Sequence, residues 1–367
     1  MAQNASLFSA FVDKFFKGIV GRFTETFNGS KDEPTYLYTT MLVEEYTPDL
    51  TWNATSLNNS IVAADVVSMD SSLPLKRRDA LSHASGEVAK LGIKKGLKEK
   101  EISDINIMAS KGQKETDIAR RILNNVPKVI GGIHTRVEIM FEQALSTGQV
   151  LIDSGNEGVG IRVDFGYKEE NTFFAMVAGW DKTNQATPLA DIRQLFDAAD
   201  ANGDTISDVY LSEQYLTYAR KTDEVKALVA AYKDQVITSG SGLPTANRTA
   251  TLSALSDEFG GATFHVVNKS YKVEDKDGKQ STVKPWAQGN IVGVPSSTVG
   301  RLVHGTLAED MNRVAGVTYQ KSGFILVSEY SHNEPSLAEF TAAQALVMPV
   351  IDDGEHIYVL HADNTEA

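Results

Sequence analysis

The sequence predicts an α+β fold. Three observations carry this prediction: one long amphipathic helix, several short runs rich in Val, Ile, Phe and Tyr, and a mixed succession of helices and strands in the second half of the chain. Hydrophobic residues make up 42% of the 367 residues. This is enough for one large or two medium domains with their own cores.

The N-terminal stretch SLFSAFVDKFFKGIVGRFTETF predicts an amphipathic helix, because apolar residues recur at helical spacing. Charged residues such as Asp13, Lys14 and Arg22 interrupt the run, which excludes the apolar core of a signal peptide. The helix therefore lies on a bilayer surface or packs on protein. We favour packing on protein, since acidic residues dilute the basic face that a membrane-surface helix needs. The candidate contact residues are Phe8, Phe11, Phe15, Phe16 and Phe23.

Residues 36–69 indicate strands and loops, because they are rich in Thr, Val and Tyr and are interrupted by Pro48 and Asn58-Asn59. A polar and strongly basic stretch follows at residues 71–102. Such a run is usually a solvated surface, but a long exposed segment without core residues tends to be functional. Its basic candidate residues are Lys76, Arg77, Arg78, Lys90, Lys94 and Lys95.

Helical spacing returns at residues 98–125 and again at residues 126–147. In the second stretch Pro127 suits a first helical turn, and Gly148 closes the helix. This is the longest clean helix pattern in the chain. His134 lies within it, where a hydrogen-bonded structural histidine is a better interpretation than a metal ligand or a catalytic base.

Strand patterns follow the long helix in QVLID, GVGIRVDFG and TFFAMVAGW. From Pro188 onward the pattern is mixed, with a helix, the short strand ISDVYLS and further helices through DEVKALVAAY. Strands are expected again in ATFHVVNKSYKVE and NIVGVPSS. The chain ends in two more strand regions, SGFILVSEY and LVMPVIDDGEHIYVLHA.

The stretch FDAADANGDTIS, Phe196 to Ser207, looks like a calcium-binding loop of the EF-hand type. With Gly203 at the turn position, Asp200 falls on a ligand position. The first and last ligand positions, however, hold Ala198 and Val209, which cannot supply the required oxygens. We therefore interpret the stretch as the C-terminal end of an amphipathic helix.

Charge and cysteine content exclude several classes of function. The net charge of -13 argues against a protein that wraps nucleic acid by neutralising phosphates. The chain has no cysteine, so disulfides and thiolate metal sites are excluded. No apolar stretch approaches the length of a transmembrane helix.

The sequence contains no recognisable catalytic constellation. G-x-S-x-G, H-E-x-x-H, phosphate-loop and G-x-G-x-x-G motifs are all missing, and the seven histidines are scattered singly. Neighbouring carboxylates such as Glu44-Glu45, Glu169-Glu170 and Asp352-Asp353 are commonplace on solvated loops. We therefore predict a structural protein and not an enzyme, with no catalytic, cofactor-binding or metal-binding residue.

The order of these elements resembles the major capsid proteins of tailed bacteriophages, and within them the lambda-like capsid family with the Hong Kong 97-type fold. The segments occur in this order from about residue 40 to residue 362, and as a set they are more specific than any one of them. They are PLKRR at Pro74 to Arg78, the segment Ile93 to Lys95, RVEIMFEQALSTGQVLID, IRVDFGY, the Trp180-Asp181 corner with PLADIRQLFDAA, and MPVIDDGEHIYVLHA.

The resemblance implies a division of the chain. Residues 1–49 would form an N-terminal arm with the amphipathic helix, and residues 50–96 an extended loop that reaches across a neighbouring subunit. Residues 97–186 and 316–367 would form the peripheral domain, with the long helix as its spine. Residues 187–315 would form the axial domain.

The implied function is self-assembly into pentamers and hexamers of the icosahedral head that encloses the viral DNA. The implied partners are copies of the chain itself, together with scaffold, portal and decoration proteins as further candidates. Double-stranded DNA would be enclosed without sequence-specific binding, and no cofactor or membrane is implied. The protein would assemble in the host cytoplasm and reside in the virion capsid.

Three other interpretations stay open at this point: an encapsulin-like compartment shell with an enzyme cargo, a calcium-binding protein that uses the Phe196–Ser207 loop, and a hydrolase with paired carboxylates. Under the capsid interpretation, the phenylalanine stripe is expected to pack on a neighbouring subunit or a scaffold, not on the subunit's own core. The basic residues are expected to meet acidic surface on a neighbour. Asp200→Ala and Asp204→Ala are expected to leave folding nearly unchanged.

Overall fold

A computed structural model of the chain describes residues 4–27, 36–56, 82–152, 161–233, 247–275, 277–333 and 336–365, together with residue 245. The chain forms two compact units. Unit 1 comprises residues 1–52, 85–141 and 301–350, and unit 2 comprises residues 53–84, 142–300 and 351–367. The four-part division expected from the resemblance remains a prediction.

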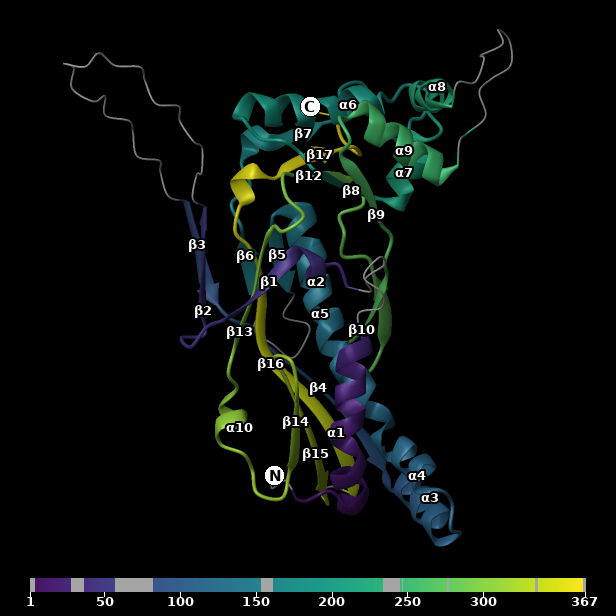
Figure 1. The fold of residues 1–367 in the computed structure, drawn as a ribbon, viewed down its shortest axis with the longest axis vertical. Coiled ribbons are helices and arrows are strands. Elements are labelled where there is room, and N and C mark those ends of the chain that lie inside the picture. The colour runs from purple at the N-terminus through teal and green to yellow at the C-terminus, as the bar shows by residue number, and fades with distance from the viewer. Residues whose placement is uncertain are drawn as a thin grey trace, which may run out of the picture. The chain divides into compact units, whose positions relative to one another are not determined.

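Unit 1 is built on a six-stranded sheet (Figure 1). Its strand order is β1-β13-β16-β15-β14, and β4 pairs with β16. The long strand β16 is the centre of the sheet, since it pairs antiparallel with both β15 and β4. The strands are β1 (Leu42–Tyr46), β4 (Lys90–Lys98), β13 (Gly300–Gly305), β14 (Thr318–Ser322), β15 (Ile325–His332) and β16 (Ala338–Ile351).

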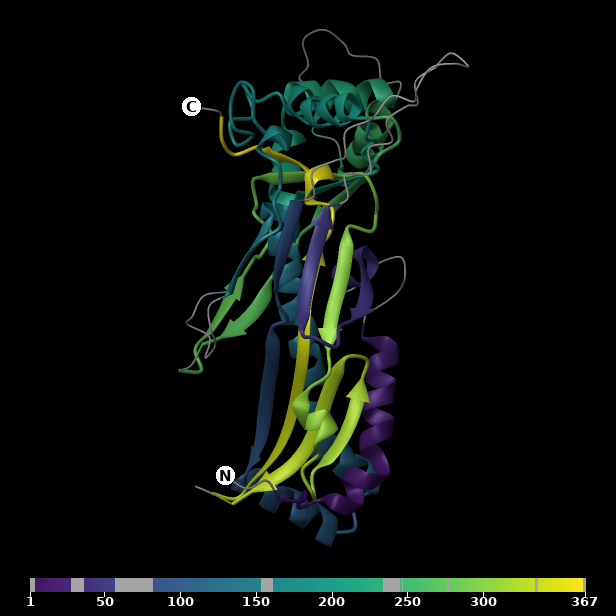
Figure 2. The same cartoon turned by 90° about the vertical axis from the view of Figure 1, so that its left-hand side faces the viewer.

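Helices accompany this sheet, and α1 runs alongside β14 in both ribbon views (Figures 1 and 2). The predicted N-terminal helix is confirmed as α1, and the predicted long helix is confirmed as α5 with its Pro127 in the first turn. The expected helix at residues 98–125 is divided into α3, α4 and a short 3-10 turn. The helices are α1 (Ser9–Thr26), α2 (Tyr38–Met41), α3 (Glu99–Ser110), α4 (Glu115–Ile122), η1 (Leu123–Asn125), α5 (Val126–Thr147) and α10 (Ala308–Met311).

Unit 2 contains a five-stranded mixed sheet with the order β7-β17-β12-β8-β9. The outer pairs β17 with β7 and β8 with β9 are parallel, whereas β12 pairs antiparallel with β17 and β8. Its strands are β7 (Thr172–Phe174), β8 (Asp208–Ser212), β9 (Thr263–Val267), β12 (Asn290–Val294) and β17 (Tyr358–His361).

Four helices gather on one face of the unit 2 sheet (Figures 1 and 2). Between them and the sheet lies a hydrophobic core that includes Trp180, Leu195, Leu216 and Tyr358. The apolar stripes that predicted these helices therefore face this core. The helices are α6 (Pro188–Asn202), α7 (Glu213–Ala219), α8 (Asp223–Tyr232) and α9 (Arg248–Glu258), and short 3-10 turns are η2 (Glu169–Asn171) and η3 (Gly354–His356).

Three two-stranded sheets complete the described chain. The strands expected in QVLID and GVGIRVDFG are confirmed as the antiparallel pair β5 (Gln149–Ile152) and β6 (Ile161–Asp164). The others are β2 (Thr51–Ser56) with β3 (Ser82–Glu87), and β10 (Tyr271–Glu274) with β11 (Gln280–Val283). Within the described ranges, none of the helices has both the length and the apolar character needed to cross a bilayer.

Candidate functional site

The phenylalanine stripe of α1 packs mainly within unit 1. Val12 and Val20 are fully buried on the same face of the helix as Phe16, which is 2% exposed, and Phe8 is also buried. Phe11, Phe15 and Phe23 are half-buried. The expectation that the whole stripe packs outside the subunit is therefore wrong for Phe8 and Phe16.

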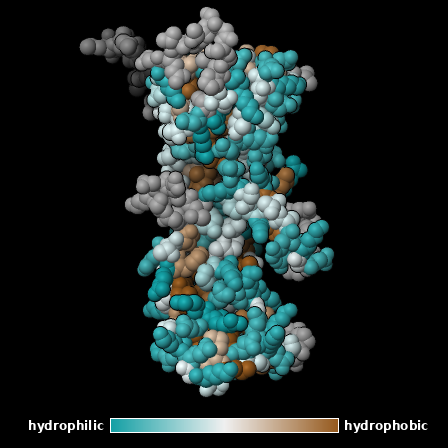
Figure 3. All heavy atoms as spheres, turned by 90° about the vertical axis from the view of Figure 1, so that its right-hand side faces the viewer, coloured by the Kyte–Doolittle hydropathy of each residue, from teal (hydrophilic) through white to brown (hydrophobic). Residues whose placement is uncertain are grey.

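The physical reason is that unit 1 supplies the apolar partner for this helix. Helix α1 lies against β14 and α4. Thr24 Oγ1 lies 2.6 Å from Ser322 Oγ of β14, and Lys14 forms an ion pair with Glu115 of α4. On the side where α1 lies, Figure 3 shows brown hydrophobic areas between teal side chains. Deletion of residues 2–28 is consequently expected to destabilise unit 1.

The basic candidate residues divide into two groups. Lys76, Arg77 and Arg78 lie outside the described residues. Lys94 and Lys95 lie on β4, where they pair with Ala342 and Thr341 of β16. The Lys94 ammonium lies 5.5 Å from the centre of the Phe340 ring, which is a cation–π distance.

Strand β4 was not predicted. The polar composition of residues 90–98 indicated a segment without core residues, but Leu91 and Leu97 are buried. Lysine and glycine separate these few apolar residues, so the sequence shows no clear strand pattern. The strand is formed because β4 pairs with β16, which lies more than two hundred residues later in the sequence.

The apparent calcium loop is a helix end, as expected. Helix α6 ends at Asn202, and Gly203 closes it with a φ of 79° in the left-handed region. Val209, the residue at the last ligand position, lies fully buried in β8. Within the described ranges, no group of three or more His, Asp or Glu side chains could hold a metal ion.

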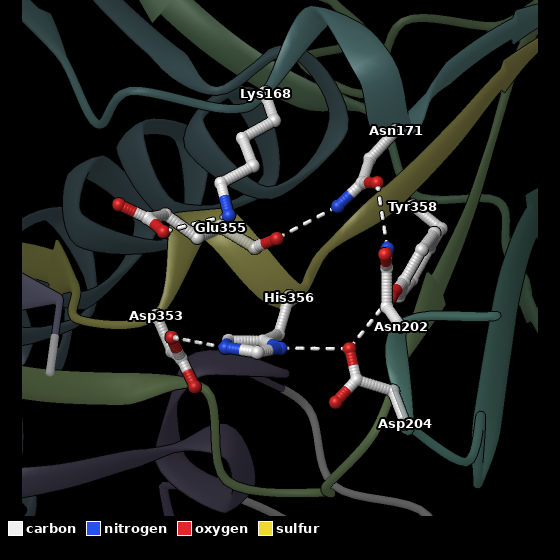
Figure 4. A network of polar contacts seen from close by, with 8 residues as sticks. All are labelled: Lys168, Asn171, Asn202, Asp204, Asp353, Glu355, His356 and Tyr358. Carbon is white, nitrogen blue, oxygen red and sulfur yellow. Dashed lines mark hydrogen bonds and ion pairs between the residues drawn. The ribbon is translucent and has the colours of Figure 1, made fainter. Parts of the chain in front are cut away.

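Asp204 of this stretch belongs to a polar network in unit 2 (Figure 4). Its Oδ2 atom lies 2.7 Å from His356 Nδ1 and accepts a hydrogen bond from the Tyr358 hydroxyl at 2.6 Å. Asn202 Nδ2 donates to the same hydroxyl at 3.1 Å. Burial and the neighbouring Asp204 carboxylate raise the pKa of Tyr358 to about 12, so this hydroxyl stays a donor at neutral pH.

The network continues through the 3-10 turns η2 and η3. Asn171 Nδ2 donates to the Glu355 carbonyl oxygen at 2.7 Å, and Asn202 Nδ2 donates to Asn171 Oδ1 at 3.3 Å. Lys168 Nζ lies 2.8 Å from Glu355 Oε2. These contacts join the end of α6 to the segments before β7 and β17, so they hold parts of unit 2 that are far apart in sequence (Figure 4).

Asp204→Ala is expected to lower the free energy of unfolding by roughly 2–3 kcal/mol, because hydrogen bonds to a charged acceptor are worth about 1.5–3 kcal/mol. This corrects the expectation of a nearly neutral effect. Asp200→Ala is the matched control, since Asp200 is exposed on the same helix end. Urea denaturation measures both; equal, small effects would show that the network does not stabilise unit 2.

His134 is a buried structural histidine, as expected. Its Nδ1 atom lies 2.5 Å from the Tyr38 hydroxyl, and its ring stacks on Phe27 with 4.1 Å between centroids. Burial lowers the pKa of His134 to about 4, so the ring is neutral at physiological pH. Glu138, one turn further along α5, accepts hydrogen bonds from the backbone N–H groups of Leu37 and Tyr38 at 2.6 and 3.0 Å. These contacts fix the start of α2 on the long helix.

A half-open cavity of about 310 Å³ lies beside this group in unit 1. Apolar and aromatic side chains dominate its wall, and the only titratable groups among its lining residues are Tyr38, Glu44 and His134. With its pKa lowered to about 4, His134 is a weak base, and its Nδ1 atom already contacts the Tyr38 hydroxyl. The lining residues are Thr24, Phe27, Tyr38, Thr39, Leu42, Glu44, His134, Leu302, Ser322, Gly323 and Phe324.

Unit 1 contains a pair of buried carboxyl groups that were not among the candidate residues from the sequence. Glu329 of β15 and Glu339 of β16 are 0% and 2% exposed. Glu329 pairs with Thr341 and Ser331 pairs with Glu339, so both carboxyl groups project from the same face of the sheet. Glu329 Oε1 accepts a hydrogen bond from Thr341 Oγ1 at 2.7 Å, and Glu339 Oε2 accepts one from the Leu7 N–H at 2.9 Å.

Comparison with known proteins identifies the family. The family described as phage major capsid protein E matches residues 22–351. The chain belongs to this family. It is a structural protein of the phage capsid, and the virion capsid is where it acts. No curated protein matches the chain.

Two solved structures support the fold of this phage major capsid protein. A crystal structure of a protein assigned as a prophage capsid protein from Escherichia coli CFT073 has 15% identity and a TM-score of 0.56, with 98% of this chain and 99% of that chain covered. A phage-related protein from Bordetella bronchiseptica RB50 has 12% identity and a TM-score of 0.53, with complete coverage of both chains. The α+β capsid fold expected from the sequence is thereby confirmed.

Proposed function

We propose that copies of this chain assemble into pentamers and hexamers, and that these close into the icosahedral head around the double-stranded DNA genome. The observation that carries the proposal is the match to the phage major capsid protein E family over residues 22–351. Closed shells arise when heterologous contacts between identical chains repeat with a curvature that closes. The chain contributes contacts and shape to this process, and we infer no catalytic role.

The charge of the chain suits a container for DNA. A net charge of -13 gives only weak attraction to phosphates, so packed DNA would move along the wall without adhering to it. We further propose assembly in the host cytoplasm, with scaffold, portal and decoration proteins as additional partners.

Electron microscopy of the purified protein tests the proposal. Closed shells or capsomer rings are expected. A protein that remains monomeric at all concentrations and salt conditions would contradict it. A small uniform shell that copurifies with an enzyme cargo would instead indicate an encapsulin-like compartment.

The basic residues Lys76, Arg77 and Arg78, together with Lys94 and Lys95, are proposed to meet acidic surface on a neighbouring subunit. Each exposed ion pair contributes about 0.2–1 kcal/mol and is screened by salt, but repetition over a shell multiplies the effect. Reversal of Lys76, Arg77 and Arg78 to Glu is expected to leave a folded subunit that assembles poorly, with the largest defect at low salt.

Particle yield by sedimentation, at low and at high salt, measures this effect. The matched control is reversal of Lys111 and Lys114, two exposed lysines on either side of the turn between α3 and α4. Normal particles from the triple variant at both salt concentrations would contradict the proposed contact.

A further inference from the structure

The loop between β7 and α6 in unit 2 presents two large hydrophobic side chains to solvent. Met176 and Val177 are each 62% exposed. Within the described part of the chain, they are the only exposed large hydrophobic residues that are neighbours in sequence. We call this pair the hydrophobic tip. Isolated exposed apolar residues are normal on protein surfaces, whereas adjacent ones on a single loop call for an explanation.

The backbone on both sides of the hydrophobic tip is held by strand β17 and the residues after it. The Ala175 N–H donates to the carbonyl oxygens of His361 and Asn364 at 3.2 and 3.0 Å. The Trp180 N–H donates to the Ala362 carbonyl oxygen at 2.8 Å. The segment between these two anchors contains only four residues, so the tip has little freedom to fold back and bury its own side chains.

Asp191 of α6 holds the same loop from a second direction. Its Oδ1 atom accepts a hydrogen bond from the Met176 N–H at 2.8 Å, and its Oδ2 atom accepts one from Trp180 Nε1 at 2.7 Å. Asp191 and Trp180 are both 0% exposed. Burial raises the pKa of Asp191, and the two hydrogen bonds that it accepts hold both ends of this loop.

Gly179 allows the close approach that completes the loop. A Cβ atom at this position would lie 2.8 Å from Asp181 Oδ1 and 3.0 Å from the Asp363 carbonyl oxygen. A larger residue would therefore push the loop away from its anchors. The same short segment is thus held by hydrogen bonds to β17 and the residues after it, by the buried Asp191 carboxylate and by the close contact at Gly179. Its two apolar side chains are nevertheless exposed to solvent.

A rigid apolar tip is well suited to binding. Association normally costs free energy for ordering loops and side chains, and a loop fixed in advance avoids much of that cost. A few residues that fill well-packed pockets carry most of the binding energy of many interfaces. Two side chains alone bury far less than the area of about 1,600 Å² that is typical of a stable complex, so the tip must be one anchor of a larger, repeated contact.

We propose that the hydrophobic tip inserts into an apolar recess on a second copy of this chain in the assembled shell. The proposal rests on the proposed assembly of copies. The chemistry around the tip favours this occupant over DNA, because the exposed carboxylates of Asp181 and Asp363 flank the loop and would repel phosphates. In a shell built from one chain, a contact of this kind recurs at every copy, which multiplies a modest energy per tip.

Cross-linking of a single-cysteine variant identifies the occupant directly. The chain has no cysteine, so Met176→Cys provides one unique attachment point for a benzophenone maleimide. Particles are assembled from a mixture of ordinary and ¹⁵N-labelled subunits and then irradiated. Cross-linked peptides that join an ordinary chain to a labelled chain are expected. Cross-linked peptides that join two segments of the same chain only, or the absence of any cross-linked peptide, would overturn the proposal.

Disruption of the tip tests its contribution. Met176→Asp combined with Val177→Asp is expected to reduce particle yield by about tenfold or more, equivalent to about 1.4 kcal/mol or more, while the circular dichroism and melting temperature of the subunit stay unchanged. Met311→Asp is the control, since Met311 is 76% exposed in unit 1. The uncharged pair Met176→Gln and Val177→Thr separates loss of apolar surface from charge repulsion.

The outcomes distinguish this inference from the proposed function. If the unaltered chain forms no particles, the proposed assembly fails. If it forms particles and both tip variants do so with equal yield, the inference about the tip fails alone. If both tip variants lose their folded circular dichroism signal, the tip is part of the fold of unit 2, and the inference is also overturned.

Discussion

Replacement of Phe16 with alanine is expected to lower the free energy of unfolding of the subunit by about 3–5 kcal/mol. Phe16 is 2% exposed and lies on α1 between the fully buried Val12 and Val20. Loss of its ring removes apolar burial and leaves a cavity between α1 and the rest of unit 1. Urea denaturation of the unassembled subunit, followed by circular dichroism, measures the effect.

Phe15→Ala is the matched control on the same helix. Phe15 is half-buried, and its ring is covered by the Lys14 ammonium at 5.4 Å. Its loss is expected to cost less than half as much in the unassembled subunit, because part of the ring is already in water. Equal losses for the two variants would show that α1 does not pack on unit 1 through the Phe16 face.

The same helix shows how far the sequence could predict this structure. Its periodicity predicts the helix and the apolar stripe, because helical spacing is a local property. It cannot predict which surface covers the stripe. That surface is formed by β14 and α4, which are about 300 and 100 residues away in the sequence from α1. The expectation of an outside partner for all five phenylalanines is therefore wrong for Phe8 and Phe16. Contact of the half-buried rings with a neighbouring subunit stays a prediction.

The loop after α6 is a second such case. The missing ligands at Ala198 and Val209 were sufficient to reject an EF-hand loop, since that motif depends on local spacing. The partners of Asp204 were not visible, because His356 and Tyr358 lie more than 150 residues further along the chain. An aspartate that looks like an exposed turn residue in sequence is thus a central acceptor in the folded unit. Met176 and Val177 show the opposite error, because TFFAMVAGW indicates a strand, whereas the strand ends at Phe174 and these two residues lie exposed in the loop that follows.

The carboxyl pair of β15 and β16 could not have been predicted, because glutamates in a strand pattern normally indicate the solvent face. The register places Glu329 beside Thr341, and Lys95 lies on the other side of Thr341 in β4. Residues before α1 cover this face: Ser331 Oγ donates to the Ala5 carbonyl oxygen at 2.6 Å, and the Leu7 N–H binds Glu339. The N-terminal segment and the carboxyl pair therefore form one buried polar group of contacts in unit 1.

The raised pKa values of Glu329 and Glu339 predict that the subunit loses stability as the pH rises. Burial raises the pKa of Glu329 well above its ordinary value, and the adjacent Glu339 raises it further, while the Thr341 hydrogen bond lowers it. Burial also raises the pKa of Glu339, and hydrogen bonds from Ser6 and the Leu7 N–H oppose that shift. The folded state consequently binds more protons than the unfolded chain above the ordinary carboxyl pKa.

The sign of the pH dependence follows from this difference in bound protons. The stability contributed by protonated Glu329 is fully present below the ordinary carboxyl pKa and is lost as the pH rises through the raised folded-state pKa, at about 1.4 kcal/mol for each unit of difference.

The side chain introduced by Glu329→Gln cannot ionise. The variant is therefore expected to be more stable than the unaltered chain at alkaline pH and to show a flatter dependence of stability on pH. Urea unfolding of the unassembled subunit between pH 5 and pH 9 measures this, with Glu25→Gln on the exposed face of α1 as the control. A Glu329→Gln variant whose stability follows the same pH curve as the unaltered chain would show that Glu329 is not the titrating group, whereas a flattened curve would assign the alkaline sensitivity of the subunit to the buried Glu329 carboxyl group.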